Sequence, residues 1–265
     1  MTSGATDRPG LAASFLHPGV AKAYEHRPPY PPEVFEVLAS LITDEPRKVL
    51  DLGAGEGALA RPLAGLVDQV DAVEISAAMI AAGRRRPGGE QPNLHWIQGA
   101  AESAPLEGAY ALVTAGASLH WMSLQQVLPR MANAMTEHAW FTVVEHDARD
   151  EPWRPGLLEV IRRHSRHQAY NADFSVVDVL AATGLWTEAG RCRTAAVAFR
   201  QPVADYIEAL HSTSSLAREL MPADEASAFD AAIAAVVEPY AEDGAVELTI
   251  VGDLAWGPIT VAGAT

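Results

Sequence analysis

Cysteine, positive charge and long apolar runs are scarce in this sequence, and each scarcity excludes a class of protein. Cys192 is the single cysteine among 265 residues, which excludes an internal disulfide and leaves no cysteine cluster for zinc. No segment approaches the roughly 18 apolar residues of a membrane span, and residues 1–15 hold no apolar core of signal-peptide length. We therefore expect a cytoplasmic protein with no metal site and no membrane partner.

Basic residues are outnumbered by acidic residues, 19 against 34, for a formal net charge of −15 at pH 7. A nucleic-acid partner is not expected, because phosphate backbones must be neutralised by cations. The run Arg84–Arg86 is a local exception, which we interpret as cations at the C-terminus of a helix. A hydrophobic content of 49% lets the chain bury a full core, and its length suits one large α/β domain.

The most informative stretch is residues 48–74, KVLDLGAGEGALARPLAGLVDQVDAVE. It begins with an apolar strand (Val49, Leu50, Leu52), which three glycines follow (Gly53, Gly55, Gly57). A helix with Leu59, Leu63 and Leu66 on one face comes next. A second strand (Val70–Val73) then ends at Glu74. A strand, a glycine loop, a helix and a second strand closed by an acid are typical of a site for a ribose-containing cofactor.

Charge in the glycine loop discriminates between cofactors. Gly53, Gly55 and Ala58 fit the dinucleotide pattern, but a pyrophosphate prefers amide donors at a helix N-terminus without competing anions. Asp51 and Glu56 would each repel it by on the order of 1 kcal/mol. S-adenosylmethionine (SAM) carries an ammonium and a sulfonium and has no phosphate, so the site suits SAM better than NAD.

Hydrophobic periodicity continues to alternate between strands and helices beyond this stretch. The pattern predicts helices near residues 34–41, 124–135 and 176–182, and strands at 93–98, 110–115, 140–145, 193–199 and 246–250. Such alternation with short loops predicts an α/β fold with a doubly wound, mostly parallel sheet. Ligands of such sheets bind outside the carboxyl ends of the strands.

Four segments resemble one known family. They are DLGAGEG with the later acid Glu74, GAAESAPL (99–106), YALVTAGASLHWM (110–122) and YEHRPPYP (24–31). The first three resemble motifs of class I SAM-dependent methyltransferases. The fourth resembles the N-terminal segment of their trans-aconitate methyltransferase-like branch, which includes many natural-product enzymes. The resemblance implies a Rossmann-like, seven-stranded sheet with an antiparallel last strand, a methyltransferase activity, SAM as cofactor and S-adenosyl-L-homocysteine (SAH) as product.

The resemblance also implies a set of cofactor-binding residues. They are Tyr24, Arg27, Asp51, Gly53, Ala54, Gly55, Glu74, Ile75, Met79, Ala101, Glu102 and Ser118. Arg27 could clamp the SAM carboxylate, although Tyr24 and Arg27 could equally anchor the proline-rich turn. The family often carries an aspartate where Ala100 stands and another near Ala111, so we assign adenine recognition to backbone amides and Glu102.

We expect one class I methyltransferase domain over residues 1–265, with additions near the active site. Residues 147–174 follow the strand at 140–145, and residues 202–244 separate the last two strands and carry two helical patterns. With the N-terminal segment 1–32, both insertions are expected to cover the site, because a long element at the ligand edge is more often a functional lid than idle mass.

Candidates for the chemistry lie just past the carboxyl ends of predicted strands. His120 could act as a general base, or it could orient its loop together with Trp121. Glu145 and His146 end the next strand, where one of them could meet the acceptor or both could be solvated loop groups. Methyl transfer mainly requires that water be excluded and that the acceptor be aligned within about 3–3.5 Å of the methyl carbon.

Trp121, Tyr170 and Tyr206 could line an acceptor pocket, although aromatic residues at helical spacing usually belong to the core. Together these features predict methyl transfer to a small aromatic or otherwise apolar metabolite of specialised metabolism, at oxygen, nitrogen or carbon, by a monomer or homodimer. Three alternatives stay open: a SAM-consuming enzyme that does not methylate, such as a cyclase; an NAD-dependent oxidoreductase; and a non-catalytic SAM-binding module.

Overall fold

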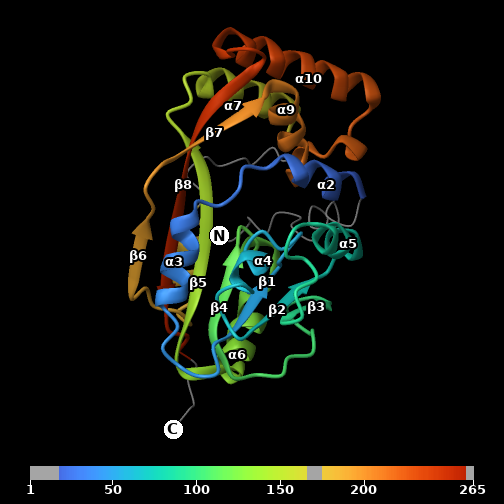
Figure 1. Cartoon of the computed structure of the whole chain (residues 1–265). Helices are drawn as coiled ribbons and strands as arrows, with labels where there is room; N and C mark the ends of the chain where they lie inside the picture. The colour runs from blue at the N-terminus through green and yellow to red at the C-terminus, as the bar shows by residue number, and fades with distance from the viewer. Residues whose placement is uncertain (1–17, 166–174, 261–265) are drawn as a thin grey trace, which may run out of the picture. The chain divides into compact units, whose positions relative to one another are not determined.

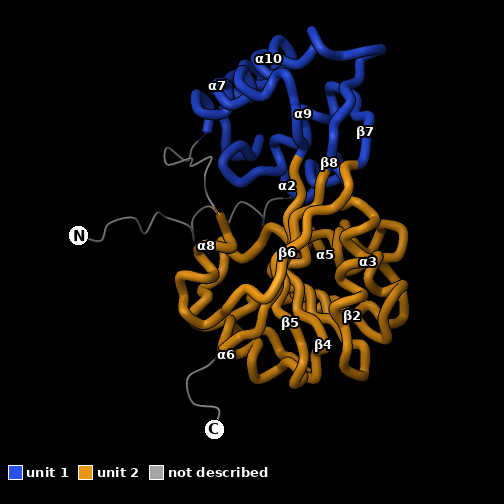
Figure 2. The backbone as a smooth tube through the Cα atoms, turned by 90° about the vertical axis from the view of Figure 1, so that its left-hand side faces the viewer, with its two compact units in different colours: residues 1–29, 148–173, 197–250 blue, residues 30–147, 174–196, 251–265 orange. Residues whose placement is uncertain are grey.

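A computed structural model describes residues 18–165 and 175–260. The chain divides into two compact units, which Figure 2 shows in blue and orange. Unit 1 comprises residues 1–29, 148–173 and 197–250, and unit 2 comprises residues 30–147, 174–196 and 251–265. Unit 1 therefore collects nearly the same three segments that the sequence predicts to be additions to the methyltransferase domain. That these segments cover an active site stays a prediction.

Unit 2 contains a parallel sheet (Figure 1). Its parallel strands are β1 (Lys48–Leu52), β2 (Gln69–Glu74), β3 (Leu94–Gln98), β4 (Tyr110–Gly116) and β5 (Met135–Arg149). The order β3-β2-β1-β4-β5 reverses direction between β1 and β4, which makes the carboxyl ends of these two strands the switch point where such sheets bind ligands. The predicted doubly wound α/β fold is confirmed.

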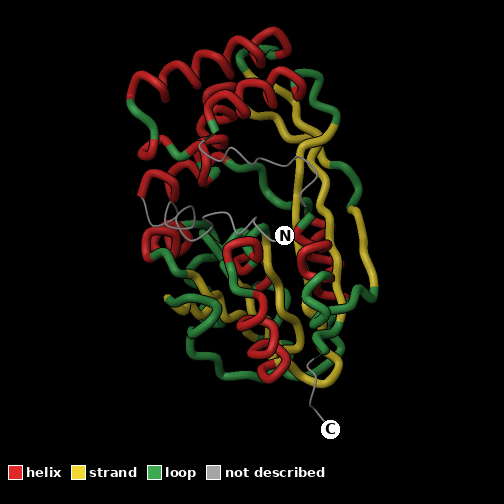
Figure 3. Tube along the Cα trace, turned by 180° about the vertical axis from the view of Figure 1, so that it is seen from behind, coloured by secondary structure: helices red, strands yellow, loops and turns green. Residues whose placement is uncertain are grey.

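Helices cover both faces of this sheet, as Figure 3 shows for the red helices beside the yellow strands of unit 2. They are α3 (Pro32–Ser40), α4 (Ala60–Leu63), α5 (Ala77–Arg85), α6 (Leu124–Ala134) and α8 (Val176–Ala181). Leu128 of α6 and Leu180 of α8 pack in one buried cluster, and Leu38 of α3 and Leu63 of α4 pack in the other. Alternate residues of the strands supply the two clusters, because successive side chains of a strand lie on opposite faces.

The helix after the glycine loop is shorter than the sequence predicts. α4 ends at Leu63, and Leu66 is 48% exposed although its spacing predicts a buried helical position. The Asn93 side chain donates hydrogen bonds to the carbonyls of Ala64 (2.7 Å) and Val67 (3.1 Å), so these carbonyls are satisfied without further helical turns.

The predicted strand over residues 193–199 is also wrong, because the structure has two strands there. β6 (Gly190–Arg193) and β7 (Val197–Pro202) both pair antiparallel to β8 (Ala245–Gly257), so the sheet has eight strands instead of seven. Between them the Thr194 amide still donates to the Gly252 carbonyl (2.9 Å), and the Gly252 amide donates to the Thr194 hydroxyl (2.9 Å). The Ala195 amide donates to the Glu33 carboxylate (2.6 Å), so side chains take over part of the backbone pairing here. The predicted antiparallel last strand is confirmed.

Unit 1 is mainly helical in its described part. Its elements are α2 (Pro18–Ala23), η2 (Tyr24–His26), α7 (Arg154–His164), α9 (Val203–His211), η4 (Ser214–Leu216), η5 (Arg218–Leu220), α10 (Ala223–Val237), η6 (Glu238–Tyr240), the strand β7 and the first half of β8. Phe229 and Ile233 of α10 are fully buried among residues of α7, α9 and β8. The two helical patterns predicted within residues 202–244 correspond to α9 and α10. No helix in the ranges described is both long and apolar enough to cross a membrane.

Candidate active site

The glycine loop of unit 2 requires its first glycine for two reasons. Gly53 has φ +65°, in the left-handed region that L side chains rarely adopt. A Cβ atom at this position would lie 2.6 Å from the Cβ of Ser118, which is too close. The Ser118 hydroxyl donates to the carbonyl of Leu52 (2.6 Å), so the loop after β4 is held against the end of β1. The structure therefore brings the predicted residues Gly53 and Ser118 together.

Asp51 lies beneath this loop and is 1% exposed. Its Oδ1 atom accepts a hydrogen bond from the Thr114 hydroxyl (2.9 Å). Burial, with a smaller contribution from the charge of Glu74, raises the pKa of Asp51 to about 7. The hydrogen bonds from Thr114 and from the Ala60 amide lower the pKa and oppose part of this rise. Asp51 is thus a buried carboxyl whose ionisation changes near neutral pH.

Glu74 joins the glycine loop to the start of α5. Its carboxylate accepts hydrogen bonds from the amides of Gly55 (2.8 Å) and Ser76 (2.7 Å), and the residue is 6% exposed. Burial raises the pKa of Glu74, and these backbone hydrogen bonds counteract part of the rise. Two further predicted cofactor residues lie near Glu74. Ile75 is 51% exposed, whereas Met79 is buried and its amide donates to the side chain of Ser76, the N-cap residue of α5. Ala54 is buried in the loop, where its amide donates to Val73.

Glu56 does not present an unpaired charge in the loop, contrary to the argument from sequence. Its carboxylate contacts the guanidinium of Arg86 (3.0 Å) and that of Arg61 (3.5 Å), and the residue is 8% exposed. Arg61, five residues later, and Arg86, thirty residues later, therefore balance its charge. Glu56 gives little reason to exclude a phosphate, and the argument from charge rests on Asp51 and Glu74.

The segment predicted to meet adenine lies after β3. The Gly99 amide donates to the carbonyl of Glu74 (3.0 Å), which places this segment beside the end of β2. Ala101 is buried, and Glu102 accepts a hydrogen bond from the Ser123 amide (2.8 Å) at the start of α6. The sequence analysis missed Arg130, whose guanidinium donates to the Ala101 carbonyl and holds the segment in place. Its position on α6 alone gave no signal of this contact.

His120 and Trp121 lie in the short helix η3 (Leu119–Trp121) directly after β4. Their ring centroids are 4.4 Å apart, and both residues are half-buried. This contact agrees with the interpretation that the pair orients its loop. It leaves the proposed part of His120 as a base untested.

Glu145 and His146 do not end their strand as the sequence predicts, because β5 continues to Arg149, and both residues are half-buried within it. Burial raises the pKa of Glu145, and the charges of Asp253 and Asp147 raise it further. The His146 ring lies 4.3 Å from the ring of Tyr30. The sequence analysis missed Tyr30, although it belongs to the same YEHRPPYP segment as Tyr24 and Arg27.

The remaining predicted residues belong to unit 1. The Arg27 guanidinium stacks on Tyr24 (3.9 Å to the ring centroid) and donates from Nε to the Ser212 hydroxyl (2.6 Å). This geometry supports the alternative in which both residues anchor their segment, here at the end of α9. The Tyr206 hydroxyl is buried and donates to Glu151 (2.9 Å), as expected for a core residue. Tyr170 lies outside the described residues.

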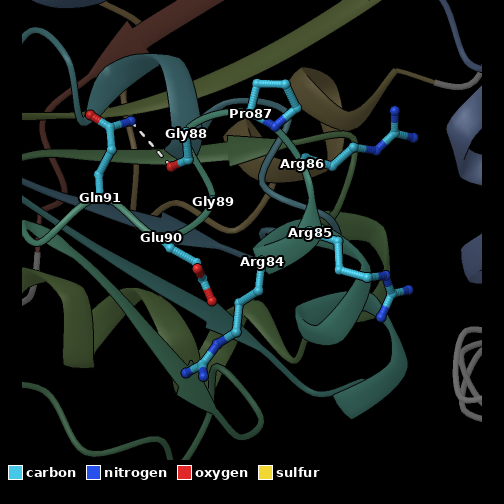
Figure 4. A pocket seen from close by; sticks show the side chains of 8 residues that line it. All are labelled: Arg84, Arg85, Arg86, Pro87, Gly88, Gly89, Glu90 and Gln91. Carbon is cyan, nitrogen blue, oxygen red and sulfur yellow. Dashed lines mark hydrogen bonds between the residues drawn. The ribbon is translucent and has the colours of Figure 1, made fainter.

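A surface pocket of unit 2 is lined by residues 84–91, which Figure 4 shows. Arg84 and Arg85 occupy the last turn of α5, as the sequence predicts. In Figure 4 these two side chains extend in different directions. Arg86 contacts the Glu56 carboxylate, which the figure does not draw. The arginines therefore do not converge on one ligand, and their position favours the interaction with the helix C-terminus. Within the described ranges, no three His, Cys, Asp or Glu side chains gather as a metal site.

Comparison with known proteins agrees with this arrangement. Residues 49–138 match the family described as Methyltransferase domain. A trans-aconitate 2-methyltransferase of Mycobacterium sp. (strain KMS) is 29% identical over 159 residues. That match covers 54% of this chain and 60% of the relative, so the chain matches only about three fifths of the length of this relative.

Solved structures share the fold at low sequence identity. A protein of Anaeromyxobacter dehalogenans assigned as a type II methyltransferase has a TM-score of 0.61 and 19% identity, over 87% of this chain and 96% of its own. A SAM-dependent methyltransferase of Geobacter sulfurreducens, solved with SAH, has a TM-score of 0.51 and 14% identity, over 95% and 98% of the two chains. Residues 49–138 thus resemble a methyltransferase domain in sequence, and the chain shares the fold of these methyltransferases.

Proposed function

We propose that this protein is a SAM-dependent methyltransferase that acts on a small molecule. The observation that carries the proposal is the pair of buried carboxyls, Asp51 and Glu74, on either side of a left-handed glycine loop at the switch point of the sheet. None of the described groups that shift the pKa of Asp51 is a cation. A buried anion without a cationic partner is costly, and a cationic ligand would relieve that cost.

The residues at this edge fit SAM. Bound SAM supplies an electrophilic methyl group on a sulfonium, and transfer leaves SAH. Glu74 has the position and charge to accept hydrogen bonds from a ribose diol, and Asp51 favours positive charge near the loop. Gly53, Ala54, Gly55, Ile75 and Met79 would surround the nucleoside, and Ala101, Glu102 and Ser118 would flank the adenine and the loop. Tyr24 and Arg27 stay candidates for the carboxylate end of SAM.

Calorimetry with SAM, SAH and NAD tests the cofactor. We expect SAM and SAH to bind, and the Asp51→Asn and Glu74→Gln variants to bind at least tenfold more weakly, because a charge-assisted contact contributes about 1.5–3 kcal/mol. Glu90→Gln, which changes an exposed acid of the same unit, is the matched control and should bind as the unchanged protein does. Preference for NAD over both adenosyl compounds would point to the oxidoreductase instead.

For the acceptor we propose a small aromatic or otherwise apolar metabolite. Glu145 lies close enough to Asp147 and Asp253 for their charges to raise its pKa, so this end of β5 disfavours a polyanion. The second candidate is trans-aconitate, which the named relatives methylate and whose three carboxylates this edge would repel. An assay with methyl-labelled SAM against trans-aconitate and a panel of neutral aromatic compounds distinguishes the two. Faster turnover of trans-aconitate would refute our choice.

We propose His120, Glu145 and His146 as the groups that could accept a proton from the acceptor, and Trp121, Tyr170 and Tyr206 as residues that shape its pocket. The segments 1–32, 147–174 and 202–244 are proposed to exclude water from the acceptor pocket.

A base role for His120 predicts that His120→Gln lowers kcat and removes one limb of the pH profile of kcat. An unchanged pH profile would leave His120 with the orienting role alone.

Product analysis separates methyl transfer from the other SAM-dependent alternatives. A methyltransferase releases SAH and adds one methyl group to the acceptor. A SAM-consuming cyclase releases methylthioadenosine instead, and a non-catalytic binding module consumes no SAM in the presence of a metabolite extract.

A further inference from the structure

We propose that Thr114 is a positioning residue whose hydroxyl holds Asp51 in its ionised form, so that the affinity of unit 2 for the sulfonium of SAM depends on pH. This inference rests on the proposed cofactor. It adds Thr114 of β4, which the sequence did not single out within the segment YALVTAGASLHWM. It predicts that Thr114 affects how strongly the site prefers the positively charged SAM to the neutral sulfur of SAH.

The geometry of the pair is set by the sheet. Asp51 of β1 and Thr114 of β4 are register partners in adjacent parallel strands. Thr114 is 0% exposed and Asp51 is 1% exposed, so water does not compete for their contact. The hydroxyl lies 2.9 Å from Asp51 Oδ1 and 3.5 Å from the Leu50 carbonyl. The shorter contact is the better hydrogen bond, so the hydroxyl proton goes to the carboxylate when Asp51 is ionised.

The same hydroxyl can serve the neutral form of Asp51. A protonated carboxyl can donate to the Thr114 oxygen, while the hydroxyl proton turns toward the Leu50 carbonyl. Donation from Thr114 favours the ionised form, because hydrogen bonds to charged groups are about twice as strong as neutral ones. Substitution by valine keeps the shape of the side chain and removes this preference.

The other described groups that act on Asp51 leave its charge poorly compensated. Glu74 at the end of β2 is an anion that opposes ionisation, and the Ala60 amide at the start of α4 favours it. Arg61, which follows Ala60, is engaged by Glu56. With a pKa of about 7, Asp51 gains its charge across neutral pH, and a nearby cation would draw it toward the ionised form.

The ratio of SAM to SAH affinity isolates this effect. Both compounds carry the same nucleoside and amino acid, and only SAM has a positive sulfur. We would measure both dissociation constants by calorimetry from about pH 5.5 to pH 8.5, the range across which a group near neutrality titrates. The ratio should rise on the order of tenfold across that range in the unchanged protein. Asp51→Asn should make the ratio independent of pH.

Thr114→Val should move the rise in the ratio to higher pH by about one pH unit, and Thr114→Ser should restore the original midpoint. Thr142→Val is the matched control. Thr142 is the fully buried register partner of Thr114 on β5, and its hydroxyl has no hydrogen-bond partner within the part of the chain that the structure describes. Its removal should leave the ratio and its midpoint unchanged.

The two proposals fail in different ways. Absence of SAM binding at every pH would refute the proposed cofactor and this inference together. SAM binding with a ratio that does not change with pH, or with the same midpoint in Thr114→Val and Thr142→Val, would refute this inference and leave the cofactor intact.

Discussion

Asp51 and Asp71 lie on the neighbouring parallel strands β1 and β2, and each is 1% exposed, but their pKa values move in opposite directions. Burial alone raises the pKa of both. At Asp71 hydrogen bonds from Tyr110 (2.6 Å) and from Gln69 (2.7 Å), together with the contact to Lys48 (3.2 Å), outweigh burial and lower the pKa. At Asp51 the hydrogen bonds from Thr114 and the Ala60 amide do not suffice, and the pKa rises.

The two residues lie one register position apart in the sheet of unit 2, since Asp71 pairs with Leu50 and Asp51 pairs with Ala72. The Asp71 side chain contacts Lys48 and Tyr110, which begin β1 and β4. Asp51 lies near the carboxyl end of β1, beside the glycine loop. Their exposed fractions are equal but their partners differ, since Asp71 has Lys48 beside it and none of the described groups that act on Asp51 is a cation. The network of Lys48 and Asp71 stabilises the fold, whereas Asp51 suits the proposed site for a cationic ligand.

The largest effect is expected from removing the cation beside Asp71. Lys48→Met leaves Asp71 buried without its cationic partner, which should cost about 3–5 kcal/mol of unfolding free energy in urea. A lowered pKa contributes stability above the ordinary pKa of an aspartate and loses it as the pH falls through the folded value. The loss in Lys48→Met should therefore be greater at neutral pH than in acid. The double variant Lys48→Met/Asp71→Asn should recover most of the lost unfolding free energy. If it does not, Lys48 stabilises the fold by something other than its pairing with Asp71.

Alanine substitutions at two glycines test how closely the glycine loop after β1 is packed. Gly53→Ala forces both a left-handed alanine and a contact 2.6 Å from the Ser118 Cβ, and should cost about 3 kcal/mol. Gly108, near the amino end of β4, also has a positive φ (+84°), but the nearest atom to its Cβ would be 3.8 Å away. Gly108→Ala should cost only about 1 kcal/mol. Equal losses of unfolding free energy would mean that the loop has room for a side chain.

Asp51→Asn should change how stability depends on pH in the ligand-free protein. A carboxyl whose folded pKa is raised binds more protons in the folded state, so stability falls as pH rises from the unfolded value through about 7. This contribution amounts to about 2 kcal/mol between about pH 5 and pH 8, and the asparagine variant should lack it. Urea titrations at several pH values measure it. Parallel curves for the two proteins would show that Asp51 does not titrate in that range.

The smallest effect is expected from single hydroxyl groups. Tyr110→Phe removes the hydrogen bond to Asp71 and should cost about 1.5 kcal/mol, because Lys48 and Gln69 remain as partners. The pKa of Asp71, followed by carbon NMR of its carboxyl, should rise. An unchanged Asp71 titration would assign the low pKa to Lys48 and Gln69. It would sharpen the contrast with Asp51, on which none of the described groups that act is a cation.

Most of the sheet and the glycine loop could be predicted from the sequence. Apolar runs such as Val49, Leu50 and Leu52 mark a buried strand, and the glycines mark the turn that follows it. The errors occurred where a side chain distant in sequence replaces a backbone bond. Asn93 satisfies carbonyls beyond α4 so that the helix ends early, and Thr194 and Glu33 interrupt the strand predicted over residues 193–199.

The candidate site was less predictable than the fold, because its properties depend on pairs. The sequence contains Glu56 in the loop but does not reveal that Arg61 and Arg86 balance its charge. It contains Arg27 but does not reveal that the guanidinium is bonded to Ser212, 185 residues later. Tyr30 and Thr114 lie within two of the family-like segments, but nothing distinguished them from their neighbours there, and Arg130 lies outside all four.

The order of strands and helices, the left-handed glycine turn and the acid at the end of β2 follow from the sequence alone, because hydrophobic period and backbone freedom are local properties. Which carboxyl is paired and which is left to a ligand was decided only by the tertiary structure. Charge compensation depends on distances of a few ångströms between strands that are tens of residues apart in the sequence. Two aspartates with the same exposed fraction have opposite pKa shifts because their surroundings in the fold differ.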